Sequence, residues 1–313
     1  MGSYRVRWYN ENKTEEKEDF MKITEGYMPF LEYRTYYRVV GDIQGGKPPL
    51  VLLHGGPGST HNYFELLDEL AEDGRAIIMY DQLGCGLSMV DNHPELWQGQ
   101  TWVDELIALR EHLQIREMHL LGQSWGGMLA IQYLCDYEPE GIKSLILSST
   151  LPSSQLWGQE QHRMIQYLPP HMQEAIRLAE ETGNYTGEAY EAANEEFMFR
   201  HCGSMPTETD PECMTRPKIR GTEAYMTAWG PNEFTPLGNL KEWNYIDKLC
   251  KIVASTLVIS GVSDLCTPLI AKTMYDAIEN SRWELFAHSR HMPFVDENNR
   301  YKQILRKWLT SND

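Results

Sequence analysis

Short apolar runs alternate with longer amphipathic stretches along most of the chain. The apolar runs lie at 49–53, 76–80, 118–121, 142–147, 254–260 and 283–286. Between them, stretches such as 62–72 and 102–113 carry leucines at helical spacing. Buried strands that alternate with amphipathic helices predict a parallel sheet covered by helices on both faces. An aromatic and β-branched segment, 27–40, predicts a hairpin ahead of this sheet.

The alternation stops near Leu151 and resumes near Ala254. Residues 151–243 have a helical, polar pattern rich in Met, Tyr and Glu, which predicts a helical cap inserted into one sheet domain. That domain would comprise residues 21–150 and 244–313. Residues 1–20 are polar and charged, and they predict a poorly ordered leader.

Composition narrows the range of partners and compartments. The formal net charge of −17 argues against nucleic acid and anionic membranes as partners. No apolar run approaches the ~18–20 residues of a membrane span, and the first residues lack an apolar signal core. Six scattered cysteines, without zinc-ligand spacing, predict free thiols in a reducing cytoplasm and no metal site.

The segment Gly122-Gln123-Ser124-Trp125-Gly126 has the pattern G-x-S-x-G at a predicted strand–helix junction. A serine at the tip of such a turn projects above the sheet, and the flanking glycines let strand and helix approach closely. The serine could instead be a simple helix N-cap, but the junction favours a nucleophile. The N–H of Trp125 then points to where an oxyanion would form.

A second glycine-rich turn, His54-Gly55-Gly56-Pro57-Gly58, follows the first apolar run. It lacks the G-K-[ST] of a phosphate-binding loop. Its position ahead of the G-x-S-x-G strand predicts that the Gly56 N–H is the second oxyanion donor. His54 comes too early in the chain for the base, and it is interpreted as a structural hydrogen-bonding residue.

A serine nucleophile requires an imidazole base and a carboxylate that orients it. His291 opens the loop before the last helix and is the candidate base, with His288 as its competitor. Asp264 follows the preceding predicted strand and is the candidate carboxylate. It could alternatively cap the next helix. The chain order Ser124, Asp264, His291 favours the catalytic interpretation.

Together these motifs resemble the prolyl iminopeptidases of the lactic-acid-bacteria type. The residues that carry the resemblance are His54 to Ser59, Tyr80 to Gly86, Gly122 to Gly127, Trp229 to Phe234, Asp264, and His291 to Phe294. The resemblance implies an α/β-hydrolase fold with an inserted helical cap. It also implies a serine exopeptidase that releases N-terminal proline from short peptides through an acyl-enzyme, without a cofactor.

The resemblance further implies that cap glutamates bind the substrate amine. Glu233 matches one such position, and Glu196 or Glu195 is the candidate for a second. An esterase or amino-acid amidase on the same fold, or a non-catalytic ligand receptor, remains an alternative at this stage. The oligomeric state is not predicted.

Overall fold

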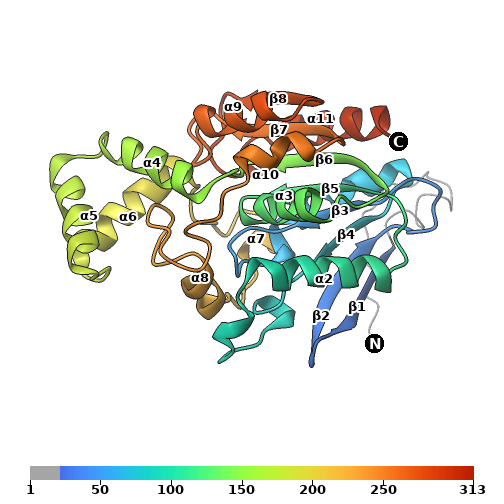
Figure 1. Ribbon diagram of the computed structural model, residues 1–313, viewed down its shortest axis with the longest axis horizontal. Coiled ribbons are helices and arrows are strands. Elements are labelled where there is room, and N and C mark those ends of the chain that lie inside the picture. Colours follow the sequence, from blue (N-terminus) through green and yellow to red (C-terminus); the bar gives the residue numbers. More distant parts are fainter. Residues whose placement is uncertain (1–21) are drawn as a thin grey trace.

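A mostly parallel, eight-stranded sheet forms the centre of the computed structural model, which describes residues 22–313 (Figure 1). The predicted leader, residues 1–20, lies outside the described residues. The strands are β1 (Ile23–Phe30), β2 (Tyr33–Val40), β3 (Leu50–Leu53), β4 (Ile77–Tyr80), β5 (Met118–Gln123), β6 (Ile142–Ser148), β7 (Ser255–Gly261) and β8 (Ser281–Phe286).

The strand order is β1-β2-β4-β3-β5-β6-β7-β8. Only the pairs β1–β2 and β2–β4 are antiparallel. The other six strands, which neighbour each other in the order β4-β3-β5-β6-β7-β8, run parallel. The carboxyl ends of these parallel strands therefore meet at one edge of the sheet, where ligands of open α/β sheets bind. The predicted hairpin and parallel sheet are confirmed.

Helices cover both faces of the sheet because its strands are apolar on both sides. One face packs against α2 (Gly99–His112), α3 (Trp125–Tyr137), η4 (Ile246–Lys251) and α9 (Pro268–Ala277). The other packs against η1 (His61–Asp73), α10 (Pro293–Asp296) and α11 (Asn298–Ser311). In β3, for example, Val51 and Leu53 belong to the first core, and Leu50 and Leu52 to the second.

The segment predicted as a helix at 62–72 is helical, but η1 is a 3-10 helix. Its buried apolar residues Phe64, Leu67 and Leu70 are spaced by three. A 3-10 helix has three residues per turn, so this spacing puts all three side chains on one face. The tighter helix therefore buries them together against the sheet.

Five α-helices, followed by the 3-10 helix η4, lie in the chain between β6 and β7. They are α4 (Ser154–Ile165), α5 (Pro170–Thr182), α6 (Glu188–His201), α7 (Glu212–Thr215) and α8 (Thr222–Ala228). Figure 1 shows α4, α5 and α6 projecting to the left of the sheet and its covering helices. Two short 3-10 turns, η2 (Gly86–Ser88) and η3 (Pro94–Leu96), precede α2. The division at residues 151 and 243 stays a prediction.

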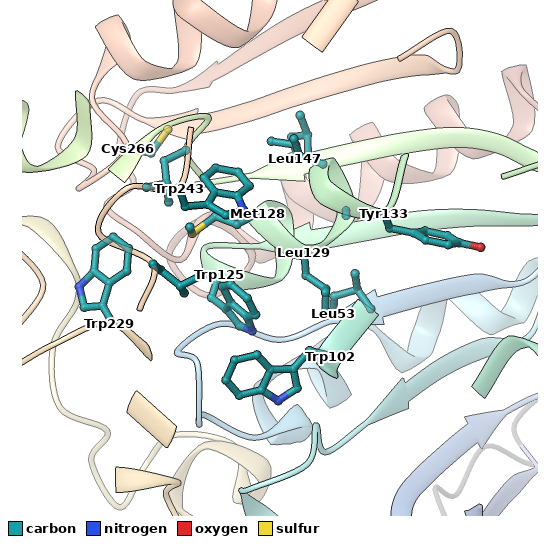
Figure 2. Close-up of a cluster of buried hydrophobic side chains, with 14 of the residues drawn as sticks. Leu53, Trp102, Trp125, Met128, Leu129, Tyr133, Leu147, Trp229, Trp243 and Cys266 are labelled. Atoms are coloured by element: carbon teal, nitrogen blue, oxygen red, sulfur yellow. The ribbon is translucent and has the colours of Figure 1, made fainter. Parts of the chain in front are cut away.

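A buried tryptophan cluster anchors the first turn of α3. Figure 2 shows Trp125 and Met128 on this helix, with Trp102 beneath and Trp229 and Trp243 approaching from the segment after α8. The rings of Trp102 and Trp125 meet edge to face at 5.1 Å. Each of these two side chains is at least 99% buried. Their close packing holds the first turn of α3 in place, and with it Ser124, the residue immediately before this helix. Within residues 22–313, no helix is both long and apolar enough to span a bilayer.

Candidate active site

Ser124 lies between β5 and α3, in a strained turn. Its φ of 55° and ψ of −124° are rare for a residue with a side chain. The turn is held on both sides: the Ser124 N–H donates to the Ser148 carbonyl at 3.1 Å, and Thr150 Oγ1 donates to the Ser124 carbonyl at 2.6 Å. Strain that neighbouring contacts hold in place is typical of a functional residue.

The two glycines of the pattern are required by close backbone approach. A Cβ on Gly126 would lie 2.0 Å from the carbonyl oxygen of Leu53 in β3. A Cβ on Gly122 would lie 2.2 Å from the Gly126 carbonyl oxygen. Helix α3 thus starts directly against the central strands, and Ser124 stands at the carboxyl edge of the sheet.

Asp264 and His291 are brought together after β7 and β8. The Nδ1 atom of His291 lies 2.8 Å from Oδ1 of Asp264. Since a carboxylate only accepts hydrogen bonds, Nδ1 carries the proton and Nε2 keeps its lone pair. Both residues are buried. His288 is exposed, and its backbone N–H instead donates to Glu297. Of the two candidate bases, His291 alone contacts the carboxylate.

The Asp264 carboxylate is held by three further donors that the sequence patterns did not reveal. Ser149 Oγ and the Gly261 N–H donate to Oδ2 at 2.6 and 3.0 Å, and the Cys266 N–H donates to Oδ1 at 2.8 Å. Four donors, counting His291, stabilise the ionised carboxylate in a buried place. The only sequence signal for Ser149 was its position directly after a predicted strand.

The loop of His291 is also tied to the serine turn. Gln123 Nε2 donates to the His291 carbonyl at 3.4 Å. Among the described residues the Ser124 hydroxyl and His291 form no hydrogen bond; such bonds are often long in unliganded enzymes and tighten with substrate. The free Nε2 of His291 can take a proton, and the hydroxyl that would supply it lines the adjoining cavity.

Gly56 and Trp125, the two predicted oxyanion donors, line the same cavity as the serine. Trp125 is the first residue of α3, so its N–H has no acceptor within the helix. Gly56 lines the same cavity as Ser124 and adopts a φ of 119°, which favours glycine. The structure therefore brings Gly56, Ser124 and Trp125 together, and the two N–H groups can stabilise an oxyanion.

Hydrogen bonds from buried polar side chains hold the loop that contains Gly56 in place. His54 Nδ1 donates to the Gly55 carbonyl at 2.9 Å, and His54 Nε2 accepts from the Gln82 N–H at 3.0 Å. Burial lowers the pKa of His54 to about 4, so the ring is neutral and structural. The Gly55 N–H donates to the hydroxyl of Tyr63, which in turn donates to Gln123 at 2.9 Å.

Ser124 and Glu233 line the same small cavity. Its apolar walls are Trp125, Met128, Leu151, Trp157 and Trp229.

Glu233 is the charged group of this cavity. Burial raises the pKa of Glu233, while His291 and the hydrogen bond from Tyr225 lower it. The Tyr225 hydroxyl donates to Glu233 Oε1 at 2.9 Å, and Trp157 Nε1 donates to the Glu233 backbone carbonyl at 2.7 Å. The enclosed carboxylate has lone pairs left for a cationic ligand.

The other glutamate candidates do not line this cavity. The Glu196 carboxylate pairs with Arg200 one turn along α6, and its side chain is half-exposed. Glu195 is exposed on the same helix. The sequence patterns missed Tyr225 and Trp157, which support Glu233 from α8 and α4. Their only signal was the abundance of aromatic residues in the inserted segment.

No cluster of three or more His, Cys, Asp or Glu side chains suited to a metal ion occurs within residues 22–313. The site groups described above are instead a hydroxyl, an imidazole, two carboxylates and backbone N–H groups. These are the groups of acyl transfer by a serine nucleophile.

Comparison with known proteins identifies the family of the chain. The sequence model of the α/β hydrolase fold family matches residues 48–298 of the chain. The crystal structure of VinJ superposes with a TM-score of 0.84 at 35% identity, covering 93% of this chain and 99% of that one. The fold and the site thus define an α/β hydrolase.

Curated relatives place the chain more narrowly. Proteins named proline iminopeptidase from Clostridium botulinum and Lactobacillus helveticus are each 62% identical to it, over 94% of this chain and 100% of theirs. The crystal structure of the proline iminopeptidase of Mycobacterium smegmatis superposes with a TM-score of 0.80 at 30% identity, covering 92% and 98% of the two chains. Within the α/β hydrolases, the chain belongs to the proline iminopeptidase family.

Proposed function

We propose that this protein is a serine exopeptidase that releases an N-terminal residue, preferentially proline, from short peptides. The observation that carries the proposal is that Ser124 and the half-buried Glu233 line one small cavity with apolar walls. A substrate that fits must present a cationic amine close to its scissile carbonyl. The near-full-length identity to named proline iminopeptidases supports proline as that residue.

In this proposal Ser124 Oγ attacks the carbonyl of the first peptide bond, while His291 Nε2 takes the hydroxyl proton. Asp264 holds the imidazole in the required tautomer and stabilises the imidazolium. The electron pair of the carbonyl moves to its oxygen, and the N–H groups of Gly56 and Trp125 stabilise the resulting oxyanion.

Collapse of this intermediate breaks the C–N bond, and His291 passes its proton to the leaving amine. The N-terminal residue remains as an ester on Ser124. Water then attacks the ester, again with His291 as the base, and the free amino acid leaves.

Glu233 sets the substrate class because it binds the amine. A carboxylate–ammonium hydrogen bond is about twice as strong as a neutral one, and the surrounding aromatic walls exclude water from it. Residues 151–243 act as the cap that carries this carboxylate and closes the cavity, so long chains are excluded. Six free thiols support action in a reducing cytoplasm, and the net charge of −17 argues against nucleic-acid partners.

A screen of amino-acyl p-nitroanilides with purified protein tests the proposal. Proline p-nitroanilide should be the preferred substrate, Ser124→Ala should abolish its turnover, and a fluorophosphonate should label the wild type alone. Hydrolysis of p-nitrophenyl acetate without any amino-acyl p-nitroanilide would show an esterase instead. Absence of both labelling and turnover would indicate a non-catalytic receptor.

A further inference from the structure

A basic segment of the chain runs along the outside of the Gly56 loop. Residues 216–221 join α7 to α8, and the Gly221 N–H donates to the Gly58 carbonyl at 2.8 Å. The Gly86 N–H likewise donates to the carbonyl of Ile219 at 2.8 Å. Hydrogen bonds on both sides therefore fix this segment against the loops that surround the serine.

Lys218 lies at the middle of this segment, within the electrostatic reach of Glu65. Its ammonium lies 5.8 Å from the ring centroid of Tyr63. No hydrogen bond or ion pair engages the ammonium in the part of the chain that the structure describes. Its neighbour Arg216, in contrast, is paired with Glu65 and Glu212. Burial, and secondarily Arg220, lowers the pKa of Lys218.

An unpaired, half-buried lysine is unexpected in this molecule. The chain has 45 acidic and 28 basic residues, so carboxylate partners are abundant. Withdrawing an ammonium from water costs free energy unless an anion compensates it. The position of Lys218 is therefore suited to binding an anionic ligand.

The location of Lys218 indicates which part of a substrate it meets. Tyr63 binds the Gly55 N–H, and its ring stacks at 5.3 Å on Phe294, three residues after His291. Lys218 thus contacts the tyrosine that packs against the segment following the base, and it does not line the cavity of Glu233. The base must protonate the leaving amine, so the leaving group departs beside His291.

We propose that Lys218 binds the free C-terminal carboxylate of the leaving group, so that dipeptides and tripeptides are the preferred substrates. This inference rests on the proposed exopeptidase function. Glu233 and Lys218 would then recognise the two opposite charges at the ends of a short peptide. A longer peptide places its carboxylate beyond reach, since each residue adds about 3.5 Å.

The test compares prolyl-alanine and prolyl-alanyl-alanine with the corresponding C-terminal amides, which lack the negative charge. The wild type should cleave the acids with a kcat/KM about 10-fold above that of the amides, as expected for one partly solvated charged hydrogen bond. Lys218→Met should reduce this ratio to near one, and Lys218→Arg should keep most of it. Lys307→Met, on the exposed face of α11, is the matched control and should behave as the wild type.

Turnover of proline p-nitroanilide, which has no carboxylate, reports whether each variant retains its fold and nucleophile. If Lys218→Met does not fold, Lys218→Gln serves as the second neutral variant. A wild-type ratio near one, or a ratio that neutral variants retain, overturns the role of Lys218 while leaving proline release intact. Failure of the wild type to release proline from any of the four peptides overturns the proposed function and this inference together.

Discussion

Replacing Glu233 with glutamine tests the amine site directly. The amide has nearly the same shape as the carboxylate and can still accept the hydrogen bond from Tyr225, so the cavity should keep its structure. What it loses is the negative charge opposite the substrate ammonium. The perturbation therefore separates recognition of the amine from the chemistry at Ser124.

The size of the effect follows from the burial of this carboxylate. A hydrogen bond to a charged group is worth about 1.5–3 kcal/mol, and Glu233 is half-buried. This range corresponds to roughly a 10- to 100-fold loss of kcat/KM for proline p-nitroanilide. We expect most of it in KM, because the amine is bound in both the ground state and the transition state.

The assay measures each variant on proline p-nitroanilide and on p-nitrophenyl acetate, a neutral ester without an amine. Glu233→Gln should leave the ester rate within about 2-fold of the wild type, since the ester makes no use of the carboxylate. Glu188→Gln, exposed in the first turn of α6, is the matched control and should change neither rate. Equal losses on both substrates would refute the reasoning, because they would place Glu233 in the chemistry or in the fold.

Three further predictions concern the serine turn, the base and a buried carboxyl. Gly126→Ala puts a Cβ 2.0 Å from the Leu53 carbonyl and should lower the free energy of unfolding by about 3 kcal/mol or more, measured in urea. Asp264→Asn should lower kcat roughly 10³–10⁴-fold with little change in KM, because the amide favours the wrong tautomer of His291; retained activity would remove Asp264 from the mechanism. Burial raises the pKa of Glu105 to about 8, so the native state keeps a proton that the unfolded chain has lost above its ordinary pKa. The contribution of Glu105 to stability should therefore fall by about 1.4 kcal/mol per pH unit between about pH 5 and 8, so the stability difference between wild type and Glu105→Gln, measured in urea, should change by this amount per pH unit; a pH-independent difference would contradict it.

Several features were predictable because their signals are local in the sequence. Each buried strand appears as a short apolar run bounded by glycines or polar residues, and the structure places a strand at each such run. The turn of Ser124 is equally local, since close approach of strand and helix demands glycine at fixed positions beside it. Periodicity and turn chemistry depend on neighbours in the chain, so the sequence alone reveals them.

Side-chain partners across the fold were not predictable in this way. Ser149 and Asp264 are 115 residues apart, yet they form a 2.6 Å hydrogen bond at the sheet edge. Glu196 and Glu233 both belong to the segment between β6 and β7, but one pairs with Arg200 while the other lines the cavity of the serine. No spacing rule distinguishes them, because the path of this segment decides which side chain reaches the cavity.

The sequence by itself thus determined the sheet with its flanking helices, the strained serine turn and the order of the reactive residues. Only the tertiary structure decided that His291 rather than His288 meets Asp264, that Glu233 is the enclosed carboxylate, and that Lys218 lies unpaired beside the serine loops. The physical reason is that local patterns fix backbone conformation within a few residues. Burial and charge pairing, in contrast, depend on which distant segments the complete fold brings into contact.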